Sequence, residues 1–160
     1  MSGMDARFRF FVITIFAVFF TAFFAASSAQ ATVGQGASSV QSDMAQLKGT
    51  NYKVTTNSVY TTYSFFAYGD TIKEYANNDG VIFAMRWHGV SQPPIKDILG
   101  TYFNSYAAAS AARAHLHMRR PIMIKTPTIH VFRGGHMRDW LGTAFVQSLA
   151  PSGITAGDLR

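Results

Sequence analysis

The chain has 160 residues, a formal net charge of +6 at pH 7 and no cysteine. The absence of cysteine excludes disulfides, thiolate metal sites, a cysteine nucleophile and a lipid-modified cysteine at a processed N-terminus. The simplest interpretation of the moderately basic net charge is a charged surface that keeps the protein soluble.

The N-terminal segment has the three parts of a secretory signal peptide. A basic start with Arg7 and Arg9 precedes an uncharged apolar run over residues 10–26, and the ending Ser28-Ala29-Gln30-Ala31 has the small residues of a cleavage site. We therefore expect a signal peptide over residues 1–31 and a periplasmic or extracellular protein. The alternative is an uncleaved membrane anchor, because the run is near the lower length limit for spanning a bilayer.

The rest of the chain is expected to form one domain. Residues 32–38 are mostly small and polar and predict a flexible tether, and residues 39–160 are long enough for a single core. An exported basic domain would meet another envelope protein or an anionic envelope component, and neither nucleic acid nor a cofactor is expected. Contact with a membrane is expected only through the signal peptide before cleavage.

Residues 80–106 predict a buried strand, a corner and a helix. A period of two places four large apolar side chains on one face of the strand, namely Val81, Phe83, Met85 and Trp87. Pro93 and Pro94 end the strand, and apolar residues at helical spacing predict one helix from about Pro94 to Arg113, packed on that face.

The remaining segments predict further strands and a short helix. A short helix is expected over residues 39–47, and Gly134-Gly135 is a hairpin signal. The expected strands cover residues 59–67, 71–76, 81–88, 122–125, 128–133 and 136–146, and residues 52–66 as a whole predict one or two strands, of which 59–67 is the firmer. The predicted fold is α+β: an antiparallel sheet of about five strands, a meander plus a C-terminal hairpin, packed against one long helix, with a short N-terminal helix.

Several sequence elements resemble one family. They are Lys73-Glu74-Tyr75, the run from Gly80 to Gly89, Pro94-Ile95 with Ile98-Leu99-Gly100 and Tyr102-Phe103, Gly142 with Ala144, and Leu149-Ala150-Pro151 with Gly153. In order and spacing they are similar to an exported bacterial family, domain of unknown function 2844. Lys73, Val90 and Ile95 depart from its pattern, where arginine, proline and an acidic residue are usual. The resemblance implies a small exported domain and supplies no activity, cofactor or site residue.

Histidines are the first candidates for chemistry. With a turn at Gly134-Gly135, His130 would face Asp139 across the ladder and could act as a base oriented by a carboxylate, with His136 nearby. No nucleophile elbow or HExxH spacing accompanies them. Glu74, between Lys73 and Tyr75, suggests a surface ion pair.

The other candidate is a basic binding patch at the C-terminal end of the predicted helix. Its residues are Arg113, His115, His117, Arg119, Arg120 and Lys125. Such a patch could bind an anion, or could serve only to complement the helix dipole. No catalytic, cofactor-binding or metal residue is assigned. We expect a non-catalytic interaction or structural module, and the alternative is a small hydrolase or metal-dependent enzyme using the His130, Asp139 and His136 region.

Overall fold

The computed structural model describes residues 33–113 and 121–159, and within them the chain is mostly β-structure. One sheet contains seven strands in the order β1-β2-β3-β4-β7-β6-β5, and every neighbouring pair is antiparallel. The strands are β1 (Thr50–Thr56), β2 (Thr61–Ala67), β3 (Asp70–Ala76), β4 (Ile82–Gly89), β5 (Ile122–Lys125), β6 (His130–His136) and β7 (Asp139–Phe145).

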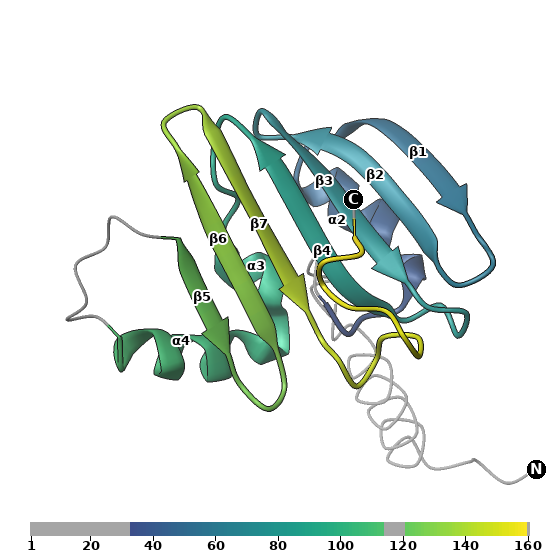
Figure 1. Cartoon of the computed structure of the whole chain (residues 1–160). Coiled ribbons are helices and arrows are strands. Elements are labelled where there is room, and N and C mark those ends of the chain that lie inside the picture. Colours follow the sequence, from purple (N-terminus) through teal and green to yellow (C-terminus); the bar gives the residue numbers. More distant parts are fainter. Residues whose placement is uncertain (1–32, 114–120, 160) are drawn as a thin grey trace, which may run out of the picture.

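The chain builds this sheet in two halves that meet at the middle strand, β4. Strands β1 to β4 form a meander, and the connection after β4 carries the chain to β5 at the opposite edge. Strands β5, β6 and β7 then return to the centre, where β7 pairs with β4 (Figure 1). Most side chains of β4, from Ile82 to Met85 and Trp87, are buried.

Short helical pieces cover one face of the sheet, and the C-terminal segment crosses the other (Figure 1). The helical pieces are η2 (Ala37–Ser39), α2 (Val40–Gln46), α3 (Ile95–Leu99), η3 (Gly100–Tyr102) and α4 (Phe103–Ala111). On the helical face, Ile98, Leu99 and Tyr106 share a core cluster with Met85 and Trp87. Within the described residues no helix is both long and apolar enough to cross a membrane.

The predicted α+β fold with about five strands and one long helix is wrong. The sheet has seven strands, because β1 is a full edge strand and β5 is separate from β6. The helix predicted from Pro94 to Arg113 is divided into α3, η3 and α4, with Gly100 at a φ of 47° where the pieces join. A left-handed residue cannot continue an α-helix, so the chain bends there and follows the twisted sheet.

Strand β4 also departs from the predicted alternation. Tyr75 pairs with Ala84 whereas Ala76 pairs with Ile82, so Phe83 is the extra residue of a β-bulge. Met85 and Trp87 face the helices as predicted, but Phe83 lies in the cluster on the opposite face. The prediction that Phe83 shares a face with Met85 and Trp87 is therefore wrong.

The bulge creates the second core cluster. The rings of Phe83 and Phe145 pack edge to face with centroids 6.0 Å apart, and Tyr75 and Leu159 belong to the same cluster. Arg86 donates a hydrogen bond to the main-chain carbonyl of Leu159. These contacts hold the C-terminal segment across the outer face.

Candidate binding surface at one end of the sheet

Two hairpin turns and the end of β4 lie at the same end of the sheet. The register shows this directly, because Asp70 pairs with Gly89, Gly89 with Trp140, and Trp140 with Gly135. This row lies next to the β2–β3 turn at Tyr68-Gly69 and near the β6–β7 turn at residues 137–138. We call this region, at the top of Figure 1, the hairpin end.

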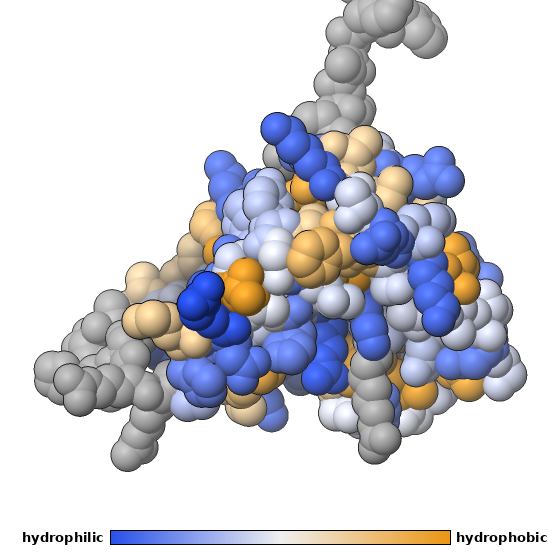
Figure 2. All heavy atoms as spheres, turned by 90° about the horizontal axis from the view of Figure 1, so that it is seen from above, coloured by the Kyte–Doolittle hydropathy of each residue, from blue (hydrophilic) through white to orange (hydrophobic). Residues whose placement is uncertain are grey.

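Three large hydrophobic side chains are exposed at the hairpin end. Tyr68 is 52% exposed, Val90 54% and Met137 83%. Seen from above, this end shows apolar atoms as separate patches among polar ones (Figure 2). Exposed apolar side chains gathered in one region are typical of interaction surfaces, whereas scattered ones are common everywhere.

The backbone at both hairpin tips adopts a conformation that non-glycine residues rarely use. Tyr68 has a φ of 57° and Arg138 a φ of 68°. A left-handed residue other than glycine costs about 1–2 kcal/mol. The two residues with this conformation place a tyrosine and an arginine at the same end of the sheet. Backbone outliers of this kind cluster at functional sites.

A buried carboxylate fixes the corner beneath these tips. Asp70 is fully buried and accepts hydrogen bonds from the Ser91 backbone N–H at 2.9 Å and, through its other oxygen, from the Ser91 hydroxyl at 3.2 Å. The same hydroxyl lies 2.8 Å from the Tyr68 carbonyl oxygen. A Cβ atom at Gly89 would overlap Asp70, which explains the glycine there. The hairpin end is therefore held by satisfied polar contacts.

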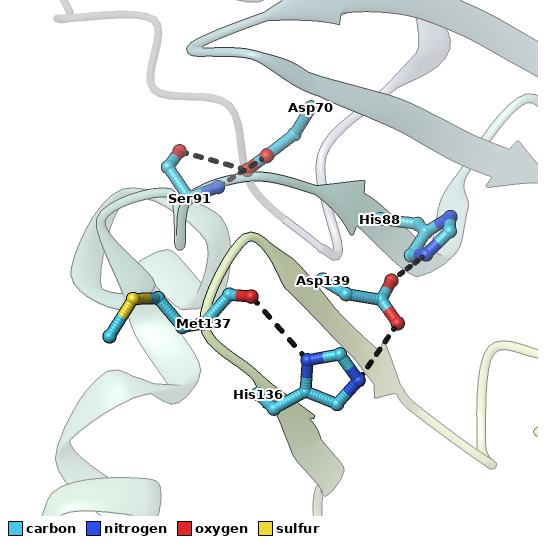
Figure 3. Close-up of polar contacts among 6 residues, drawn as sticks. All are labelled: Asp70, His88, Ser91, His136, Met137 and Asp139. Carbon is cyan, nitrogen blue, oxygen red and sulfur yellow. Dashed lines mark hydrogen bonds and ion pairs between the residues drawn. The ribbon is translucent and has the colours of Figure 1, made fainter.

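Two histidines contact one aspartate on the outer face of this end (Figure 3). His88 Nε2 lies 2.8 Å from one oxygen of Asp139, and His136 Nε2 lies 3.5 Å from the other. His136 is the cross-strand partner of Asp139, whereas His130 pairs with Phe145. The predicted pairing of His130 with Asp139 is therefore wrong, because the turn lies at residues 137–138 and Gly134-Gly135 belongs to β6.

This cluster has limited chemical scope. The side chains of His88, Asp139 and His136 are 60%, 52% and 80% exposed, so water screens their interactions. The Ser91 hydroxyl is bound to the Asp70 corner and lies apart from the histidines in Figure 3. In residues 33–113 and 121–159, no group of three or more histidine, cysteine, aspartate or glutamate residues could hold a metal ion.

Only two residues of the predicted basic patch lie in the described part of the chain. Arg113 is exposed and donates a hydrogen bond to the Met123 carbonyl of β5, and Lys125 is exposed on the same strand. The other four, His115, His117, Arg119 and Arg120, lie outside the described residues. The patch stays a prediction.

Sequence reasoning missed the most unusual titratable groups, Asp43 and Glu74. Glu74, predicted to form a surface ion pair, is fully buried, as is Asp43. The alternation of Ile72, Glu74 and Ala76 along β3 contained the signal, because it places the carboxyl group on the same face as two apolar residues.

A family model described as Protein of unknown function (DUF2844) matches residues 29–159. No curated protein and no solved structure matches the chain. The match spans both halves of the sheet and includes the elements whose resemblance was noted in the sequence. The chain therefore belongs to this family of proteins of unknown function.

Proposed function

We propose that this protein is exported by its N-terminal segment and acts in the periplasm or outside the cell as a non-catalytic interaction module. Its binding surface is the hairpin end, and its partner is another envelope protein. The observation that carries the proposal is the exposure of Tyr68, Val90 and Met137 at one end of the sheet, where the Asp70 corner fixes the backbone beside Tyr68 and Val90.

The chemistry of the hairpin end supports a protein partner. An aromatic ring, an aliphatic side chain and a thioether offer apolar contact, and Arg138 stands beside them at the tip of the β6–β7 turn. Tyrosine, methionine and arginine are enriched at protein interfaces. The histidine–aspartate cluster borders this surface and adds polar contacts at its rim.

A capture experiment tests the binding surface. The protein lacking residues 1–31 is used as bait in an envelope extract, beside a Tyr68→Asn/Met137→Ser variant. Asparagine is chosen because it tolerates the left-handed backbone at position 68. Met123→Ser is the matched control, since Met123 is 50% exposed on β5, away from the hairpin end. We expect the double variant to lose a protein that the control retains.

Equal recovery of every captured protein by bait and double variant would remove the hairpin end from consideration. An Arg119→Glu/Arg120→Glu variant distinguishes the hairpin end from the predicted basic patch. A partner that only this variant loses binds the basic patch. A partner that is an anionic polymer would be released by salt.

Export is tested separately. Cell fractionation followed by N-terminal sequencing should recover a protein that begins at Thr32 outside the cytoplasm. Recovery of the uncleaved chain in the membrane fraction would favour the anchor instead.

A further inference from the structure

Glu74 lies on the covered face of the sheet, and its carboxyl group has no hydrogen-bond partner within residues 33–113 and 121–159. It pairs with Tyr63 of β2 and Met85 of β4, and its side chain is fully buried. Among the described residues neither of its carboxyl oxygens has a donor, and the same holds for Oδ1 of Asp43 in α2. Asp43 Oδ2 accepts a hydrogen bond from Ser39 at 3.1 Å. In the part of the chain that the structure describes, these three buried carboxyl oxygens are unsatisfied, which is costly for a charged group.

The groups around Glu74 oppose its ionisation. Burial, and then the charge of Asp43, raise the pKa of Glu74 well above its usual value. Burial raises the pKa of Asp43 to about 6, partly offset by Ser39. Tyr63 faces Glu74 from β2, and Tyr52 of β1 stacks on Tyr63 with centroids 6.4 Å apart. The titratable groups that face Glu74 are thus an acid and two phenols, all of which become negative on losing a proton.

Helix α2 covers this site as a short segment that is hydrogen-bonded to the start of β4 on its N-terminal side and followed by a left-handed turn on its C-terminal side. Before it, Gly34 and Ala37 donate backbone hydrogen bonds to Ile82 and Gly80 at 2.7 and 2.6 Å. After it, Lys48 has a φ of 50° and Gly49 follows. Two large side chains of the segment, Val40 and Leu47, are buried in the core.

We propose that α2 is a proton-dependent strap: it lies over Glu74 while Glu74 and Asp43 are protonated, and it leaves the sheet when they are ionised. Its departure admits water to both carboxylates and uncovers the apolar face of β2 and β3 around Phe65 and Ile72. The ladders of β2, β3 and β4 remain paired, because their hydrogen bonds do not depend on α2. The inference is independent of the proposed function, which rests on the other side of the sheet and on its hairpin end.

The direction of the pH dependence follows from proton counting. The closed form binds more protons than the open form, so rising pH favours opening. Each proton released on opening increases the opening constant by up to about tenfold per pH unit. Two protons are released between about pH 4.5 and 6, where both groups are ionised in the open form and Asp43 still holds its proton in the closed form, and one is released above about pH 6.

Hydrogen exchange on the full chain tests the strap. Exchange of the α2 amides, residues 40–46, is measured between pH 4.5 and 9 and corrected for the intrinsic pH dependence of exchange. We expect their protection to fall with rising pH while that of β4 is retained. Glu74→Gln should remove the dependence above pH 6, and Asp139→Asn, which changes an exposed carboxylate, should keep it. Asp43→Asn is the second variant, and should leave a dependence of one proton.

Three outcomes would overturn the strap. Protection of α2 that is constant with pH means that the carboxyl groups do not control it. The same dependence in Glu74→Gln and in the parent chain assigns it to other groups. Loss of β4 protection together with α2 means that the domain unfolds as a whole.

Discussion

Replacing Gly142 by alanine should destabilise the domain strongly, because the indole ring of Trp87 occupies the space that a Cβ atom needs. Gly142 pairs with Trp87 across β4 and β7. A Cβ atom at Gly142 would lie 2.8 Å from Cη2 of Trp87 and closer still to Cζ2 and Cε2. Trp87 is 1% exposed and belongs to the core cluster that contains Ile98, Leu99 and Tyr106 of the helical pieces, so the ring can move only by displacing its neighbours.

We expect Gly142→Ala to lower the free energy of unfolding by about 3 kcal/mol, at the upper end of the range for overpacked cores. The reason is that a ring and two central strands must move, rather than one flexible side chain. With a urea m-value of about 2 kcal/mol/M, the unfolding midpoint falls by about 1.5 M. Gly157→Ala is the control. Its nearest neighbour is 3.7 Å away, and we expect it to leave the midpoint nearly unchanged.

A second substitution tests the cause. Trp87→Phe removes the atoms that clash, and it also removes an Nε1 donor that is buried without an acceptor among the described residues. In the Trp87→Phe background, Gly142→Ala should therefore cost about 2 kcal/mol less than in the parent chain. A Gly142→Ala loss below about 0.5 kcal/mol, or an equal loss in both backgrounds, would refute the packing argument.

Three further predictions concern charged groups. Asp43→Asn should raise the free energy of unfolding by at most about 3 kcal/mol at pH 8 and change it little at pH 4. The pKa of Asp43 is raised from 3.8 to about 6 in the folded state, so the aspartate lowers stability progressively as the pH rises between these two values, and the loss is complete above about pH 6. Urea unfolding at both pH values checks this, and a larger effect at pH 4 would contradict it. Arg86→Met should lower the free energy of unfolding by about 1 kcal/mol and speed hydrogen exchange near Leu159, because it removes the hydrogen bond that holds the C-terminal segment. Unchanged exchange near Leu159 would show that the bond is dispensable. Asp139→Asn should change the free energy of unfolding by less than about 0.5 kcal/mol, since its histidine contacts are exposed, and a larger loss in urea unfolding would mean that the cluster is structural.

The meander of β2, β3 and β4 could be predicted from sequence because local signals agree there. Tyr68-Gly69 forms a two-residue turn with both φ values positive, and β3 matches the expected strand within one residue. The short helix expected over residues 39–47 is α2 with its flanking residues. In each case the pattern and the turn residues point to the same structure.

The helix and the bulge could not be predicted because the sequence pattern is compatible with more than one structure. Apolar spacing continues through Gly100, and only the tertiary contacts of α3 and α4 decide that this glycine bends the chain. Residues 82 to 84 are all apolar, so a one-residue bulge at Phe83 leaves no mark in the hydrophobic pattern. The bulge error arises because burial on two faces of β4 removes the contrast that periodicity needs.

The hairpin error has a different cause. Gly134-Gly135 is a strong turn signal in sequence, but in the structure a Cβ atom at Gly135 would meet the backbone of Asp139 and Trp140. Gly135 permits the close approach of β6 and β7, and the turn is made by Met137 and Arg138 instead. Glycine marks a steric requirement, and the sequence does not say whether a turn or a neighbouring strand imposes it.

Most residues that carry the family resemblance have a structural explanation. Trp87 fits over Gly142, and Gly89 leaves room for the Asp70 corner. Val90, where this chain departs from the family pattern, is instead 54% exposed at the hairpin end. Glu74 is the exception among the resembling residues, because an unpartnered buried carboxyl group weakens a fold unless it is kept protonated. The proposed release of α2 would give Glu74 a second state, in which its carboxylate is hydrated.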